Sequence, residues 1–114
     1  MAVNINILNA GNMTLGSASD PRKTKITFAD GHVEEYIIPD DSSWDFFREH
    51  TNANITEIDI GNTITGIGSD TFMDYSTLVS VTIPNSVTYI GGYAFEDCSN
   101  LTNVTIGSGV NSID

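Results

Sequence analysis

Apolar residues recur at a fixed step in the second half of the chain. Ile55, Leu78 and Leu101 are each separated by 23 residues. Four more apolar columns keep this step without an insertion: Ile58, Val81 and Val104; Ile60, Ile83 and Ile106; Ile64, Val87 and Val110; Ile67, Ile90 and Ile113. A fixed period of this length is typical of stacked repeat folds. The predicted units are repeat 1 (55–77), repeat 2 (78–100) and a truncated repeat 3 (101–114).

Within a repeat, the spacing of apolar residues changes from one segment to the next. Val81 and Ile83 alternate with polar neighbours, which predicts a strand buried on one face, and Pro84 ends it because proline has no N–H to donate. Residues 93–96 are predicted to form a short helical turn on the way back. One such coil is too small to bury its own apolar face, so the repeats are predicted to stack in parallel.

The repeat residues resemble the leucine-rich repeats of the BspA-like class of bacterial surface antigens, with the pattern L-x-x-I-x-I-P, V-x-x-I-G, A-F and C. Repeat 2 carries the whole pattern, whereas repeat 1 has Gly61, Thr71 and Tyr75 in place of Pro, Ala and Cys. The resemblance implies a right-handed solenoid with a parallel sheet on its concave side and no catalytic residues. It also implies a secreted or cell-surface protein used for adhesion and protein contacts, although residues 1–8 lack the pattern of a secretion signal.

Residues 1–54 follow a different pattern and are predicted to cap the stack, because the end of a repeat array needs covering. The predicted elements are strands 3–8, 24–29 and 32–38 and a helix 44–50. Asp30-Gly31 predicts a two-residue hairpin turn that pairs Phe28 with Val33. The expected fold is therefore a strand-rich α/β leucine-rich-repeat solenoid. It has a parallel concave sheet, short helical turns and an N-terminal β-hairpin plus helix cap.

Charge and composition exclude several function classes. The chain has 114 residues, a net charge of −11 and only four Lys and Arg residues, so it is poorly suited to nucleic acid or to an anionic membrane surface. No apolar run is long enough to insert across a bilayer. One cysteine provides no internal disulfide framework.

The strongest candidate binding surface is a pair of polar columns on the predicted sheet. Its residues are Glu57, Ser80 and Asn103 in one column and Asp59, Thr82 and Thr105 in the other. These columns predict a contact surface for a protein or glycan partner, and the alternative is a solvated sheet face without a partner. Tyr89 is predicted to point outward, where it either stacks on a partner or covers a neighbouring glycine.

The sequence does not place a catalytic or metal site. A catalytic role for Cys98 would need a base and an orienting group, and no nucleophile motif surrounds this residue. Neither His32 nor His50 has a partner at the spacing of metal ligands. Asp40 and Asp41 precede the predicted helix, where the positive end of the helix dipole favours acidic side chains. The alternative is that these carboxylates bind a cation. We therefore expect no enzyme activity, cofactor or metal.

The last predicted strand leaves a second candidate surface. Val104 and Ile106 are expected to present an open backbone edge and a bare apolar column. This end is expected either to continue into a longer array or to pair with a second copy of the chain. Two functions follow from these surfaces. The first is a non-catalytic protein-interaction or adhesion module that binds through the concave face. The second is a structural or assembly module, such as a spacer or cap of a larger surface or virion protein.

Overall fold

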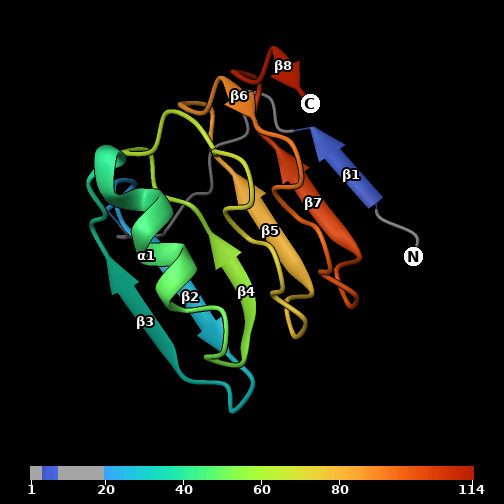
Figure 1. Ribbon diagram of the computed structural model, residues 1–114. Coiled ribbons are helices and arrows are strands. Elements are labelled where there is room, and N and C mark those ends of the chain that lie inside the picture. Colours follow the sequence, from blue (N-terminus) through green and yellow to red (C-terminus); the bar gives the residue numbers. More distant parts are fainter. Residues whose placement is uncertain (1–3, 8–19) are drawn as a thin grey trace.

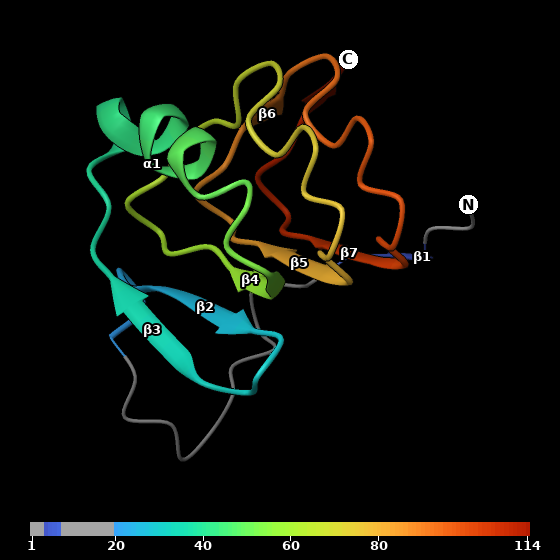
Figure 2. The same cartoon turned by 60° about the horizontal axis from the view of Figure 1, so that its bottom comes forward.

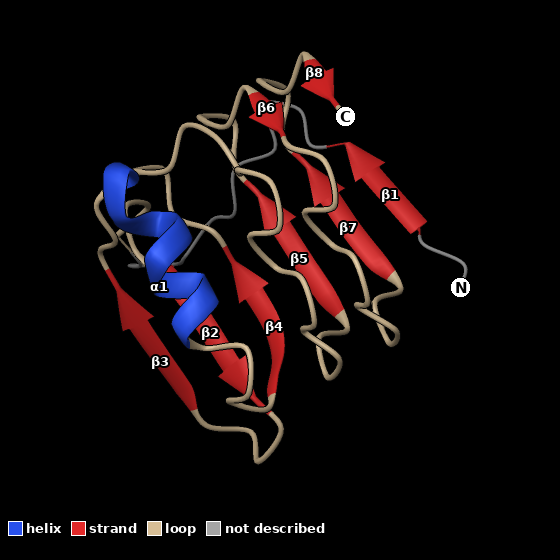
Figure 3. Ribbon diagram, in the orientation of Figure 1, coloured by secondary structure: helices blue, strands red, loops and turns tan. Residues whose placement is uncertain are grey.

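The computed structural model describes residues 4–7 and 20–114 and consists of strands, turns and one short α-helix (Figures 1 and 3). The strands are β1 (Asn4–Ile7), β2 (Thr24–Phe28), β3 (Val33–Tyr36), β4 (Ile55–Asp59), β5 (Ser80–Ile83), β6 (Tyr89–Ile90), β7 (Asn103–Ile106) and β8 (Ser112–Ile113). A 3-10 turn, η1 (Asp40–Ser42), leads into α1 (Ser43–Glu49). Residues 3 and 8 of the predicted first strand lie outside the described residues.

The larger sheet aligns the repeats residue by residue. It has six strands in the order β1-β7-β5-β4-β2-β3, and β6 and β8 form a second, two-stranded sheet. Strands β4, β5 and β7 are parallel, and Ile58, Val81 and Val104 are register partners, each one 23-residue step apart. Since β2 and β3 are antiparallel, the sheet is mixed. This strand-rich sheet with one short helix fits a repeat fold.

The apolar columns form the core on one side of the sheet, where α1 and the return segments of the repeats also lie (Figure 2). Ile55, Leu78 and Leu101 are each at most 2% exposed. A row of aromatic rings runs through the same core. The ring of Phe72 lies 4.6 Å from that of Phe47 and is stacked at 5.4 Å on that of Phe95. Each repeat therefore buries its neighbour's side chains as well as its own.

The return segments are hydrogen-bonded turns, so the predicted short helical turns are wrong. In repeat 2, Tyr93 and Asp97 have positive φ angles of 59° and 61°, and Asp70 and Asp74 of repeat 1 have 64° and 67°. A residue in the left-handed region interrupts an α-helix. Only three residues lie between the two left-handed positions of each return segment, which is too few for a helix to form.

The hairpin of β2 and β3 is shifted by one residue from the predicted register. The loop has three residues, because the Phe28 amide donates to the His32 carbonyl at 3.0 Å and Gly31 has a φ of 90°. A one-residue shift moves every side chain of a strand to the other face. Tyr36 therefore faces the buried side, whereas Val33 is 45% exposed.

Helix α1 begins one residue before the predicted position and has no side-chain hydrogen bond at its N-cap, Ser42. Contacts with repeat 1 fix its position. The Trp44 indole N–H donates to the Ser69 carbonyl at 2.8 Å, and the Arg48 guanidinium donates to the carbonyls of Asp70 and Met73 at 3.1 and 2.8 Å. Phe47 is buried beneath the helix, whereas Trp44 is half exposed.

We predict that replacing the central ring of the aromatic row destabilises the protein more than replacing the outer one. Phe72 is fully buried, whereas Phe95 is only partly buried. Phe72→Ala is therefore expected to cost about 3–5 kcal/mol of unfolding free energy, and Phe95→Ala clearly less. Urea unfolding followed by circular dichroism measures both losses. An equal or larger loss for Phe95→Ala would contradict the burial described here.

Candidate functional site

The polar side of the larger sheet brings the two predicted columns together. We call it the polar sheet face, and its predicted residues are Glu57, Asp59, Ser80, Thr82, Asn103 and Thr105. Glu57, Ser80 and Asn103 are register partners on β4, β5 and β7, and so are Asp59, Thr82 and Thr105. All six are exposed or half exposed. Like positions on neighbouring strands lie about 4.8 Å apart, so the face presents closely spaced carboxylate, amide and hydroxyl groups.

A polar hollow of about 130 Å³ lies at one end of this face. Its polar lining comes from three strands: Lys25 and Thr27 of β2, Glu57 and Asp59 of β4, and Ser80 and Thr82 of β5. The hollow therefore holds two carboxylates, one ammonium group and three hydroxyls, a set that can both donate hydrogen bonds to a polar ligand and accept them from it.

The surroundings of Asp59 in the hollow change the acidity of its carboxyl group. Partial removal from water raises the pKa of its carboxyl group, and the positive charge of Lys25 opposes this increase. Lys25 and Asp59 are register partners on adjacent antiparallel strands. They do not form an ion pair within 4.0 Å among the described residues. Both residues are exposed, so a ligand can reach either charged group.

Lys25 and Thr27 were not predicted to belong to the site. The sequence contains no signal that β2 pairs antiparallel with β4. That pairing sets Lys25 opposite Asp59 and Thr27 opposite Glu57. A contact between residues 25 and 59 is formed by the tertiary fold, and neither the repeat spacing nor strand alternation encodes it.

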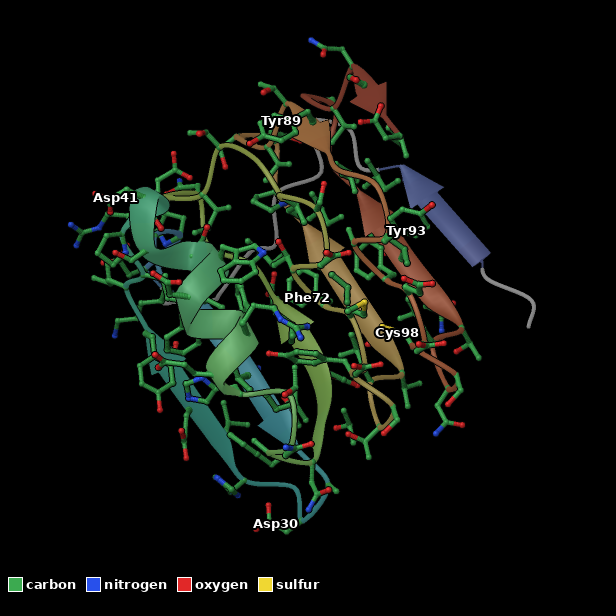
Figure 4. The ribbon with its side chains drawn as sticks, in the orientation of Figure 1. Asp30, Asp41, Phe72, Tyr89, Tyr93 and Cys98 are labelled. Atoms are coloured by element: carbon green, nitrogen blue, oxygen red, sulfur yellow. The ribbon has the colours of Figure 1, made fainter. Side chains whose placement is uncertain are left out.

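Tyr89 is the first residue of β6, which belongs to the two-stranded sheet and not to the larger sheet that carries the polar sheet face (Figure 4). It is 49% exposed. Its ring covers Gly66 so closely that a Cβ at Gly66 would lie 2.2 Å from Tyr89 Cε1. The ring therefore fills the space above a glycine of the preceding repeat, which is the second of the two roles predicted for it.

The backbone edge at Val104 and Ile106 is not open as predicted. β1 runs parallel to β7, and Ile5 and Ile7 are the register partners of Val104 and Ile106. Both residues of β7 are also buried. The prediction missed this pairing because β1 is far from β7 in the sequence. In the sheet, β1 occupies the place beside β7 that a strand of the next repeat would take.

The remaining candidates have structural contacts. The Cys98 thiol is buried and donates to the Phe72 carbonyl at 3.0 Å, and burial raises its pKa to about 11, so it is not a thiolate nucleophile near neutral pH. The Asp40 carboxylate accepts hydrogen bonds from the amide and hydroxyl of Thr65 at 2.8 and 2.6 Å. It therefore links η1 to repeat 1.

Two searches of the described residues found no further candidate. No three or more His, Cys, Asp or Glu side chains gather there as metal ligands would. No helix in that part of the chain has the length and apolar character needed to cross a membrane.

Comparison with known proteins identifies the repeat region. A family model described as BspA type leucine rich repeat region (6 copies) matches residues 45–114, more than half of the chain. The match begins within α1, ten residues before the first predicted repeat. No curated protein and no solved structure gives a significant match.

We predict that Lys25 limits the increase in the pKa of Asp59 that burial causes. Removing the positive charge with Lys25→Met should raise the pKa of Asp59 further, because Lys25 is the group that lowers it. Since the folded pKa is above the ordinary value, the contribution of Asp59 to stability is lost as pH rises through that pKa. Carboxyl-carbon NMR titration measures the pKa directly. Lys23→Met is the matched control, and an unchanged Asp59 pKa in Lys25→Met would refute the prediction.

Proposed function

Because the chain belongs to the BspA-type leucine-rich repeat family, we propose that it is a non-catalytic protein-interaction or adhesion module that binds through the polar sheet face. Membership of this family supports an interaction or adhesion role. The observation that carries the proposed binding mode is the in-register alignment of Glu57, Ser80 and Asn103 beside Asp59, Thr82 and Thr105.

The same proposal includes the form of the array. We infer that the three repeats coil as a solenoid with the polar sheet face on the inside of the curve, and that residues 1–54 cap it. Two observations support the capping role. β2 pairs antiparallel with β4 at one end of the repeat strands, and α1 is hydrogen-bonded to repeat 1 through Trp44 and Arg48.

The partner is a protein segment or glycan rich in hydrogen-bonding groups. The hollow offers the carboxylates of Glu57 and Asp59 as acceptors and the Lys25 ammonium group as a donor. Aromatic and arginine side chains, which dominate many tight protein interfaces, do not occur among the described residues that line this hollow. Binding is therefore expected to depend on several hydrogen bonds rather than on one aromatic anchor.

The test measures how the chain and two variants bind immobilised bacterial and host surface proteins and glycans. In each variant, two acidic residues are replaced by their uncharged amides. Glu57→Gln with Asp59→Asn should lower the affinity for the captured partner at least tenfold, which corresponds to about 1.4 kcal/mol. Asp41→Asn with Glu49→Gln removes the same charge near α1 and should leave the affinity unchanged. Equal losses in both variants would show that net charge, and not the polar sheet face, determines binding.

A further inference from the structure

Strand β3 is paired on one side only. It is the outermost strand of the larger sheet, and β2 is its one strand neighbour among the described residues (Figure 1). We call its other side, along Val33–Tyr36, the β3 edge. The free backbone groups of an outermost strand are a template for pairing with another extended chain. The β3 edge is therefore a candidate binding surface that is separate from the hollow.

The hydrogen-bonding pattern of the hairpin shows which backbone groups of β3 are free. The Phe28 amide donates to the His32 carbonyl at 3.0 Å. Hydrogen-bonded pairs recur at every second residue of an antiparallel ladder, so the next such residue of β3 is Glu34. The alternate residues, Val33 and Glu35, direct their N–H and C=O groups away from β2. Outside the β2–β3 ladder, neither has a backbone hydrogen bond among the described residues.

The contacts of β2 on its other side agree with this assignment. The Thr27 carbonyl faces β4, because it accepts a hydrogen bond from the Thr56 hydroxyl at 3.2 Å. Thr27 is the register partner of Val33. In an antiparallel ladder, the two residues of a pair that is not hydrogen-bonded direct their backbone groups away from each other. Val33 and Glu35 therefore offer two donors and two acceptors to an incoming strand.

The fold holds β3 in place before any partner binds. At the end of the strand, the Tyr36 ring packs edge-on against the Phe46 ring of α1, with 5.1 Å between the ring centroids. Two residues further on, Ile38 is buried and its carbonyl accepts a hydrogen bond from the Thr63 hydroxyl at 2.7 Å. A surface that is already ordered loses little conformational entropy when a partner binds.

The side chains beside the free backbone groups specify the partner. Val33, Glu35 and Ile37 alternate along the chain, so they lie on one face of the sheet. Val33 and Ile37 are 45% and 48% exposed, and Glu35 between them is also exposed. Lys25 is the register partner of Glu35, but the two do not form an ion pair within 4.0 Å among the described residues. The edge thus presents an apolar, an acidic and an apolar side chain in a row.

This row disfavours a second copy of the chain as the partner. Antiparallel pairing of two β3 strands centred on Glu35 would place the two Glu35 side chains opposite each other. Pairing centred on Glu34 would do the same for Glu34. Like charges directly opposite each other are destabilising, and each chain carries a net charge of −11. A basic side chain opposite Glu35 is favourable instead.

We propose that the β3 edge binds an extended segment of a partner polypeptide that carries a lysine or arginine between two apolar residues at alternate positions. The segment adds a strand to the larger sheet, and its backbone forms hydrogen bonds with Val33 and Glu35. Its basic side chain lies beside the Glu35 carboxylate, and its apolar side chains cover Val33 and Ile37. Strand addition of this kind is a recurring mode of peptide recognition.

The probe is the synthetic peptide acetyl-TVTKTIT-amide, which has the proposed alternation. Titration into the ¹⁵N-labelled chain should shift the amide signals of Val33 and Glu35 and slow their hydrogen exchange. The same peptide with every amide N-methylated keeps its charge and side chains but cannot donate backbone hydrogen bonds, and it should bind at least tenfold more weakly. Equal binding of the two peptides, or amide shifts confined to other residues, would overturn the proposal.

A charge exchange tests the role of Glu35. The peptide with Glu in place of Lys should bind the unmodified chain at least tenfold more weakly than the probe. Glu35→Gln should reduce this preference to less than threefold, whereas Glu96→Gln, the same change on an exposed residue of repeat 2, should leave it unchanged. Thermal unfolding verifies that each variant is folded. A preference that persists in Glu35→Gln would contradict the proposal.

Two further measurements separate this site from the alternatives. Glu57→Gln with Asp59→Asn should leave peptide binding intact, so failure of the sheet-face proposal is distinguishable from failure of this one. Without peptide, the amide signals of Val33 and Glu35 should not depend on protein concentration. If they shift with concentration, a second copy of the chain occupies the β3 edge and the proposal is wrong.

Discussion

The structure depends on the in-register stacking of repeats that cannot bury their apolar side chains alone. Val81 is covered on one side by Ile58 and on the other by Val104, because all three are register partners in adjacent parallel strands. The return segments follow the same step, as the amide of Phe72 and the carbonyl of Ala94 show. One geometric relation between neighbours therefore positions both the core and the polar sheet face.

The residues that follow this relation were predictable from the sequence. The five apolar columns and the two polar columns depend only on local alternation and a constant step, and the structure aligns strands β4, β5 and β7 accordingly. The hairpin register was predicted wrongly, because Gly31 takes the left-handed position of a three-residue loop and shifts the partner of every β2 residue. The pairing of Lys25 with Asp59 is formed by the tertiary fold, so no local pattern reveals it.

The two ends of the larger sheet are completed by segments that do not belong to the repeats. At one end the hairpin adds β2 in antiparallel orientation, and at the other end β1 adds a parallel strand to β7. β1 continues the repeat register, since Ile5 is opposite Val104. It closes the strand edge of β7. The two added segments therefore flank the three repeat strands that carry the polar sheet face.

The central claim is the alignment of like residues in neighbouring repeats. Its most direct test is a methyl NOE experiment on a sample labelled at the isoleucine δ1 carbons. The account predicts strong contacts between Ile60 and Ile83 and between Ile83 and Ile106, one strand spacing of about 4.8 Å apart. It predicts a weak or missing contact between Ile60 and Ile106, which are two spacings apart. A direct Ile60–Ile106 contact, or no contact between Ile83 and either neighbour, would contradict the account.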